Sequence, residues 1–300
     1  MGILMPCADD DRGGPLLRRI KDALSALFAG EHLDRLAWCG YTPELVVARD
    51  LLADRLQALP SVAVADVLDE AFRTLVRDHP VEYVFKSCAL ERLLFGRHSP
   101  RTTAFYTEFR VGDSRADLVV INGQAHIYEV KTPYDDFSRL AAQLEDYYRA
   151  FTHVTLFVDE ARAGSVSRIV PEFTGIVVLS RKYSMSTVRP AVANAEGLDS
   201  RTLFRLLHST EYLPLLAQQG FDLRCTDRAL RYGRCLEAFA DLDPRDAHRD
   251  VMQVLKQRQR TTHLADIAAG LPQSLRLAPF AYRKSKSDWG ALSQRVQLHV

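Results

Sequence analysis

The 300-residue sequence lacks an uninterrupted apolar run of about 18 residues, the length that a membrane-spanning helix requires. Its longest apolar runs, such as Thr174 to Ser180, have the length of a strand. The first residues form too short an apolar run for a secretory signal and turn acidic at Asp9 to Asp11. We therefore expect a cytoplasmic protein with no membrane partner.

The sequence also lacks the cysteine and histidine patterns of common zinc and redox sites. No CxxC pair and no HxxH or HExxH spacing occurs among its 5 cysteines and 9 histidines. The cysteines are odd in number and widely spaced: Cys7, Cys39, Cys88, Cys225 and Cys235. We expect them to be reduced and Cys88 to lie in the core.

No strong excess of one charge is present, because the formal net charge is only +1. Charge is nevertheless unevenly distributed, since residues 251–300 carry +6 and the other 250 residues carry -5. The basic residues of this segment are Lys256, Arg258, Arg260, Arg276, Arg283, Lys284, Lys286 and Arg295. Such a segment could contact nucleic-acid phosphates, or it could be a solvated, partly flexible tail.

The sequence has a globular composition, with 47% hydrophobic and 26% charged residues. The spacing of its apolar residues changes along the chain. Helical spacing runs from Pro43 to about Leu94, interrupted by Pro60 and Pro80. β-rich runs follow at 104–111, 117–121 and 125–131, then a helical run at 137–151 and two further strand-like runs at 154–158 and 175–179. Helical segments return at about 199–218, 226–239 and 245–260.

This order predicts an α/β or α+β fold. Three consecutive strands can form an antiparallel meander, and a helix before the next strand permits a parallel crossover, so the sheet should be mixed. We expect four regions: a variable, partly disordered N-terminus over 1–40, a helical region over 41–80, the sheet-containing core over 81–190, and a helical C-terminal region with a basic tail over 191–300.

Two carboxylates and a lysine occupy the predicted hairpin around Asn122-Gly123. A two-residue loop there would place Asp117 opposite Tyr128 and turn Glu129 to the other face. A loop with an odd number of residues instead places Asp117 opposite Glu129 or diagonal to it, with the Cβ atoms of a directly opposed pair about 5 Å apart. Lys131 shares the face of Glu129. We predict the odd-length turn, because only that parity brings the carboxylates together.

Such a site suits a hard cation that assists phosphodiester hydrolysis. Asp117, Glu129 and the Val130 carbonyl could ligate Mg²⁺ or Mn²⁺, with phosphate as a further ligand. Lys131 could orient a water or stabilise oxygens on phosphorus. Without metal the two acids should repel each other, so we expect one of their pKa values to rise.

The pattern Arg115-x-Asp117, Tyr128-Glu129-Val130-Lys131, Asp136-x-x-Arg139-Leu140 and Gln143-x-x-x-Tyr147 resembles the PD-(D/E)xK nuclease superfamily, and within it an uncharacterised bacterial branch. The resemblance covers about Phe105 to Asp159 most clearly. It differs from the superfamily pattern in having Ala116 where proline is usual before the aspartate.

This resemblance implies a restriction-endonuclease-like αβββαβ core. It also implies that Asp117, Glu129 and Lys131 bind metal and assist attack, and that Gln143 faces the site from its helix. The superfamily often adds an acid from the preceding helix, for which Glu91 is the first candidate. Glu82 is the reserve candidate, and Glu108 on the first strand is a third.

These observations favour a metal-dependent nuclease acting on DNA. A non-catalytic nucleic-acid-binding or regulatory protein that retains the fold is the alternative, and an enzyme acting on RNA or a small phosphate ester is a third. The sequence leaves open whether the protein forms a homodimer or binds a protein partner.

Overall fold

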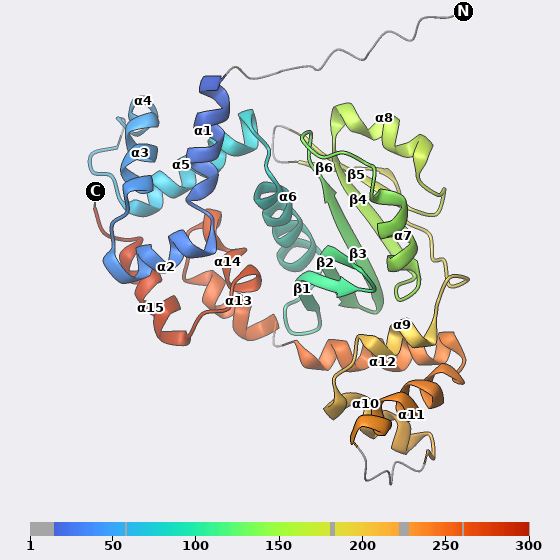
Figure 1. Ribbon diagram of the computed structural model, residues 1–300. Coiled ribbons are helices and arrows are strands. Elements are labelled where there is room, and N and C mark those ends of the chain that lie inside the picture. The colour runs from blue at the N-terminus through green and yellow to red at the C-terminus, as the bar shows by residue number, and fades with distance from the viewer. Residues whose placement is uncertain (1–14, 58, 181–183, 222–227, 260, 300) are drawn as a thin grey trace, which may run out of the picture. The chain divides into compact units, whose positions relative to one another are not determined.

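The computed structural model describes residues 15–57, 59–180, 184–221, 228–259 and 261–299 (Figure 1). Cys7, Cys225 and Arg260 lie outside the described residues. The chain divides into two compact units, one of residues 1–75 and 285–300 and the other of residues 76–284. Within the described ranges, no helix combines the length and the apolar character needed to cross a membrane.

The first unit is helical. Its elements are α1 (Pro15–Ala26), α2 (Gly30–Cys39), α3 (Pro43–Leu51), α4 (Ala53–Leu56), most of α5 (Val64–Asp78) and α15 (Lys286–Arg295). Residues 15–39, which belong to the region expected to be variable and partly disordered, include α1 and α2, and their Leu24, Leu27, Leu33 and Leu36 are fully buried.

Most described residues of the basic C-terminal segment 251–300 lie in helices. Its last helix, α15, packs against α2 within the first unit. Two of its cations already pair with acids of the second unit: Arg258 donates to Glu211 with an Nε–Oε1 distance of 2.7 Å, and Arg276 lies 3.2 Å from Glu91. These pairs reduce the charge that the segment can offer to a nucleic acid.

The second unit contains the sheet. Its strands are β1 (Ala104–Val111), β2 (Ser114–Asn122), β3 (Gln124–Lys131), β4 (His153–Asp159), β5 (Gly175–Leu179) and β6 (Met185–Arg189). The helices before and between them are α6 (Glu82–Ala89), the π-helix η1 (Leu90–Arg97), α7 (Leu140–Tyr148) and α8 (Glu160–Ile169). The helices after the sheet are α9 (Ser200–Arg205), α10 (Ser209–Gln218), α11 (Arg228–Ala240), α12 (Pro244–Arg258), α13 (Thr261–Ala269), the 3₁₀ helix η2 (Gln273–Leu275) and α14 (Ala278–Ala281).

The strands form one sheet in the order β1-β2-β3-β4-β5-β6. Pairing is antiparallel from β1 to β3, parallel from β3 to β5, and antiparallel between β5 and β6. The predicted α/β fold with a mixed sheet is thus confirmed, and the two parallel pairings are made by crossovers through α7 and α8.

Helices cover both faces of the sheet, with α6 on one side and α7 and α8 on the other (Figure 1). The α7 side buries Val119 and Ile127 of the meander and Leu156 of β4 against Leu144 and Tyr147 of α7. Because side chains alternate along a strand, this face also receives Glu129 and Lys131. The polar residues near the end of β3 therefore lie under α7.

Two elements lack the sequence signals that we used. Strand β6 is mostly exposed and so has no alternating apolar pattern. Helix α8 buries only Val166 and has no apolar stripe, although Asp159 caps it by accepting a hydrogen bond from the Ala161 N–H.

Candidate active site

The β2–β3 hairpin has the odd parity that the site requires. Asn122 pairs with Gln124 across the single residue Gly123, whose φ of 74° suits glycine. The regular pairing runs through Ile121–Ala125 and ends at Leu118–Tyr128, and the same register continued by one residue would set Asp117 across from Glu129. The predicted odd-length turn around Gly123 is confirmed, since a two-residue loop would have paired Asp117 with Tyr128.

Glu129, Lys131, Gln143 and Tyr147 form what we call the Glu129 cluster. The Lys131 ammonium donates to Oε1 of Glu129 and to Oε1 of Gln143, each at 2.9 Å. The Gln143 amide donates to the same Glu129 oxygen at 2.8 Å, and the Tyr147 hydroxyl donates to Oε2 at 2.7 Å. Glu129 is only 2% exposed and Lys131 only 9%, so this ion pair is held away from bulk water.

Helix α7 positions its two members of this cluster through the spacing of its residues. Gln143 and Tyr147 are four residues apart and therefore share one face, while Leu140 and Leu144 anchor the helix in the core. The Tyr147 hydroxyl also lies 3.0 Å from the Arg115 carbonyl oxygen, which ties α7 to β2. Burial, and then the charge of Glu129, raise the pKa of Tyr147, so the hydroxyl keeps its proton.

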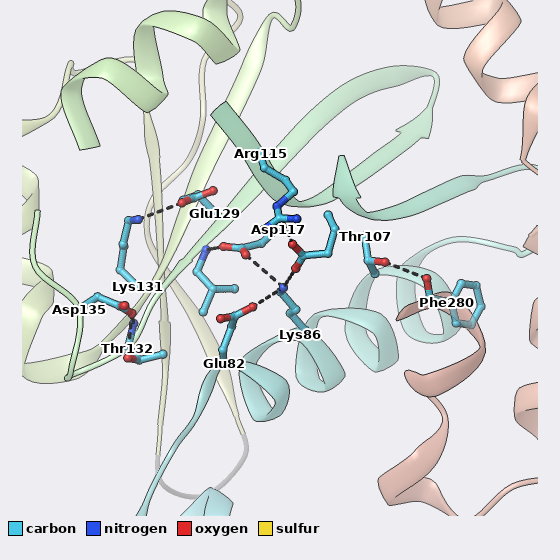
Figure 2. Close-up of polar contacts among 12 residues, drawn as sticks. Glu82, Lys86, Thr107, Arg115, Asp117, Glu129, Lys131, Thr132, Asp135 and Phe280 are labelled. Atoms are coloured by element: carbon cyan, nitrogen blue, oxygen red, sulfur yellow. Dashed lines mark hydrogen bonds and ion pairs between the residues drawn. The ribbon is translucent and has the colours of Figure 1, made fainter. Parts of the chain in front are cut away.

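Glu82, Lys86, Glu108 and Asp117 form a second group, which we call the Asp117 cluster. Figure 2 labels Glu82, Lys86 and Asp117 of this cluster. The Lys86 ammonium lies 3.1 Å from Oδ1 of Asp117 and also contacts carboxylate oxygens of Glu82 and Glu108. The other oxygen of Asp117 accepts a 2.7 Å hydrogen bond from the Val130 N–H. Figure 2 shows Asp117 between Lys86 and Glu129, at the junction of the two clusters.

Glu108 reaches the Asp117 cluster through an unusual backbone conformation. It has a φ of 53° and is the sole non-glycine residue with positive φ among the described residues. The β1–β2 register pairs Thr107 with Leu118 and Phe109 with Ala116, so Glu108 stands opposite Asp117 without forming a regular bridge. Such a conformation costs about 1–3 kcal/mol and is concentrated at functional sites. Glu108, Asp117 and Glu129 thus occupy aligned positions on three neighbouring strands.

The ionisation of the Asp117 cluster reflects burial and crowding of like charges. Burial, and then the neighbouring Glu129, raise the pKa of Asp117 to about 7 despite the proximity of Lys86. Burial alone would lower the pKa of Lys86, but the carboxylates of Asp117 and Glu82 outweigh it and raise the pKa. The prediction that one acid of the pair would have a raised pKa is confirmed for Asp117.

Comparison with known proteins places the chain in a family. A family model described as bacteriophage P4 protein cII matches residues 76–274, about two thirds of the chain. The chain belongs to this family. Among solved structures, a protein of unknown function from Silicibacter pomeroyi is similar at 19% identity with a TM-score of 0.27, over 47% of this chain and 82% of that chain. No curated protein matches the chain.

The cII-family match spans both clusters, which include most of the residues expected from the sequence. Glu129, Lys131 and Gln143 are joined by direct contacts, and Asp117 lies near enough to Glu129 for its charge to affect the pKa of Asp117. The Val130 N–H donates a hydrogen bond to Asp117, and the metal contact expected of the Val130 carbonyl stays a prediction.

The first candidate for the helix acid, Glu91, is not brought to either cluster. It belongs to η1 and pairs with Arg276, whereas the reserve candidate Glu82 lies beside Asp117 with Glu108. Glu82 and Glu91 are nine residues apart, which places them on opposite faces of a regular helix. Sequence analysis missed Lys86, although a lysine within the apolar run of α6 was a detectable signal.

The donors of the Asp117 cluster fit a hard divalent cation. One carboxylate oxygen from each of Glu82, Glu108 and Asp117 lies within 4.8 Å of the others, and oxygen is the ligand that Mg²⁺ and Mn²⁺ prefer. Glu129 is not a member of this group, and its oxygens accept from Lys131, Gln143 and Tyr147. This group shares Asp117 with the predicted metal ligands Asp117, Glu129 and Val130.

Proposed function

We propose that this protein is a metal-dependent nuclease that hydrolyses phosphodiester bonds, with DNA as the first candidate substrate. The arrangement of Lys131 carries this proposal. A lysine ammonium has three N–H donors, and Glu129 and Gln143 accept two of them. Among the described residues no contact engages the third, which leaves it for a phosphate oxygen or for the attacking water.

The remaining side chains would prepare Lys131 for this role. Glu129 holds the ammonium in place, and Gln143 and Tyr147 hold Glu129 in turn. A pre-positioned cation of this kind stabilises negative charge that develops on phosphate oxygens without having to reorganise during the reaction. A divalent cation held by Asp117, Glu108 and Glu82 would supply further positive charge at the same phosphate.

Two features support a nuclease related to the PD-(D/E)xK superfamily. From α6 to β4 the elements follow the order helix, three strands, helix, strand. The acidic residues and the lysine stand on β2 and β3, and the glutamine stands on the following helix. The proposal rests on these positions and on their mutual contacts.

A second candidate function is favoured by Lys86. Its ammonium contacts all three acids of the Asp117 cluster, as a counterion would in a protein that has no need of metal. A non-catalytic nucleic-acid-binding or regulatory protein would be stabilised by such a pairing. Retention of Lys131 with an open donor favours catalysis over this alternative.

The test is incubation of the purified full-length protein with supercoiled plasmid in Mg²⁺, Mn²⁺ or EDTA. Wild type should nick or linearise the plasmid only with metal, and Glu129→Gln should not. Glu145→Gln is the matched control, because it makes the same chemical change at an exposed position of α7. Binding of DNA without cleavage in any metal would favour the non-catalytic alternative, and parallel assays on RNA test the substrate class.

A further inference from the structure

The Asp117 cluster has an internal cation where a metal ion would bind. The oxygens of Glu82, Glu108 and Asp117 that could ligate a metal converge within 4.8 Å of one another, and the Lys86 ammonium contacts an oxygen of each. A metal bound by all three carboxylates would need the space and the charge contacts that Lys86 now has.

The charge of this cluster is not balanced by Lys86 alone. Three carboxylates face one ammonium, while Glu129 is already paired with Lys131. Arg115 adds a 3.0 Å contact to Glu108, but its side chain is 67% exposed, so solvent weakens this pair. The cluster therefore retains an attraction for a cation of higher charge than an ammonium.

The geometry allows the exchange. Glu82 and Glu108 have side chains that are 57% and 42% exposed, so the cluster opens to solvent on their side. A lysine has a flexible four-carbon stem and can move its charged end toward water without movement of the helix backbone. The Lys86 side chain is itself only 7% exposed, so its charged end would leave the carboxylates on the side where Glu82 and Glu108 meet solvent.

We propose that Lys86 is a built-in competitor of the divalent cation, which binds Glu82, Glu108 and Asp117 only by displacing the Lys86 ammonium. This inference rests on the proposed function, in which those carboxylates hold the metal. Lys86 would set a threshold for metal, and the site would be loaded only when the cation concentration is high enough to displace the lysine. Without metal, Lys86 would hold the three acids together.

The experiment measures Mn²⁺ binding by isothermal titration calorimetry on full-length wild type, Lys86→Met and Lys131→Met. Removal of a positive charge in contact with the ligands should tighten Mn²⁺ binding about tenfold or more in Lys86→Met. Lys256→Met, prepared alongside, is the matched control, because it makes the same change at an exposed lysine outside both clusters. Its affinity should stay within about threefold of wild type. Lys131→Met tests instead whether the metal lies at Glu129, the partner of Lys131.

Thermal unfolding gives a second readout on the same samples. Without metal, Lys86→Met should melt at a lower temperature than wild type, because three acids lose their shared cation. Saturating Mn²⁺ should raise its melting temperature by more than it raises that of wild type, because an ion that binds only the folded state stabilises it. Equal shifts in the two proteins would contradict the proposal.

If Lys86→Met does not fold, Mn²⁺ binding is compared between the single variant Glu82→Gln and the double variant Glu82→Gln with Lys86→Met. The double variant has one acid fewer to neutralise, and it should still bind Mn²⁺ more tightly than Glu82→Gln alone. The proposal is overturned if the double variant binds Mn²⁺ no more tightly than Glu82→Gln. It is also overturned if Lys131→Met gains more Mn²⁺ affinity than Lys86→Met, because that result would place the metal at Glu129. Plasmid cleavage by wild type separates these results from failure of the nuclease assignment, because cleavage can persist when Lys86 does not compete with metal.

Discussion

The Glu129 cluster and the Asp117 cluster contain the same functional groups in opposite proportions. In the Glu129 cluster three donor side chains surround one carboxylate, and Lys131 has a donor to spare. In the Asp117 cluster three carboxylates surround one ammonium, so the donors of Lys86 are all in use and negative charge remains. One cluster is therefore suited to donate to an anion and the other to receive a cation.

The two clusters also differ in how easily their contacts can be broken. Glu129 and Tyr147 are almost completely buried, and the contacts between them lie within the core. Glu82 and Glu108 are largely exposed, and their contacts with Lys86 compete with water. Buried charge pairs are costly to break, whereas exposed ones contribute little. We infer that the Glu129 cluster is preformed and that the Asp117 cluster is the part that changes on loading.

The largest expected effect is on cleavage. Lys131→Met should lower the rate of plasmid cleavage about 10²–10³-fold, the range found when a pre-positioned donor to a developing oxyanion is removed. Gln143→Ala should have a smaller effect, because it leaves the ammonium in place and removes one of the groups that orient it. Rates are measured at saturating Mg²⁺, with Glu145→Gln as the control for α7. If Lys131→Met cleaves plasmid at the wild-type rate, Lys131 has no catalytic role that distinguishes it from Lys86.

The next effect is on the pH dependence of stability. Because the pKa of Asp117 is raised to about 7, the folded protein holds a proton that the unfolded chain releases above its ordinary pKa of 3.8. This contribution to stability is complete below pH 3.8 and is lost as the pH rises through about 7. The free energy of unfolding should fall by up to about 1.4 kcal/mol per pH unit in that window.

The measurement is denaturant unfolding in EDTA between pH 4 and pH 8 for wild type and Asp117→Asn. Buried histidines act in the opposite direction, since burial lowers the pKa of His126 to about 3 and of His248 to about 4. Subtraction of the two curves removes this background, because both proteins contain the histidines. A difference curve that is flat with pH would show that Asp117 is not crowded as described.

A smaller effect concerns the rigidity of the Glu129 cluster. Tyr147→Phe removes a hydroxyl that donates to Glu129 and lies near the Arg115 carbonyl, both in a buried place. The free energy of unfolding should fall by about 1–3 kcal/mol, the cost of an acceptor left without its donor. Tyr148→Phe is the control on the next residue of α7, and it should cost less because its partner, the Thr174 hydroxyl, is neutral and can rotate. If both variants lose the same free energy of unfolding, the charge of Glu129 does not strengthen its hydrogen bond from Tyr147.

The sequence predicted the Glu129 cluster far better than the Asp117 cluster, and the reason is physical. The hairpin parity and the spacing of Gln143 and Tyr147 are local, because strand alternation and helical period fix which side chains share a face. Only the choice of loop length around Gly123 had to be guessed.

The Asp117 cluster depends instead on how α6 is rotated against the sheet. Val84, Phe85, Cys88 and Ala89 are all buried, so α6 is apolar on several faces and its pattern does not reveal which acid faces β2. Glu91 was the first candidate from its position in the sequence. The helix changes to π-helical geometry at Leu90, so the position of Glu91 around the helix axis does not follow from that of Glu82. The conformation of Glu108 has no sequence signal either, because glutamate does not favour a positive φ.

The smallest expected effect distinguishes the two lysines in DNA binding. Each phosphate contact contributes about 0.9 to the slope of log affinity against log salt concentration on duplex DNA. Lys131→Met should lower the magnitude of this slope by up to about 0.9, because the spare donor of Lys131 faces the substrate in the proposed function. Lys86→Met should leave the slope unchanged, since the Lys86 ammonium is turned inward to three carboxylates. Slopes are measured by fluorescence anisotropy in EDTA, which prevents cleavage.

The same titration tests the basic C-terminal segment. Lys256 and Arg283 are exposed cations of the second unit, and their joint replacement by Ala should lower the slope by up to about 1.8 if both contact phosphates. An unchanged slope in this pair, together with a reduced slope in Lys131→Met, would confine the phosphate contacts to the sheet. A reduced slope in Lys86→Met would contradict the difference between the two lysines, because an ammonium paired with three carboxylates of the protein should not contact DNA phosphates.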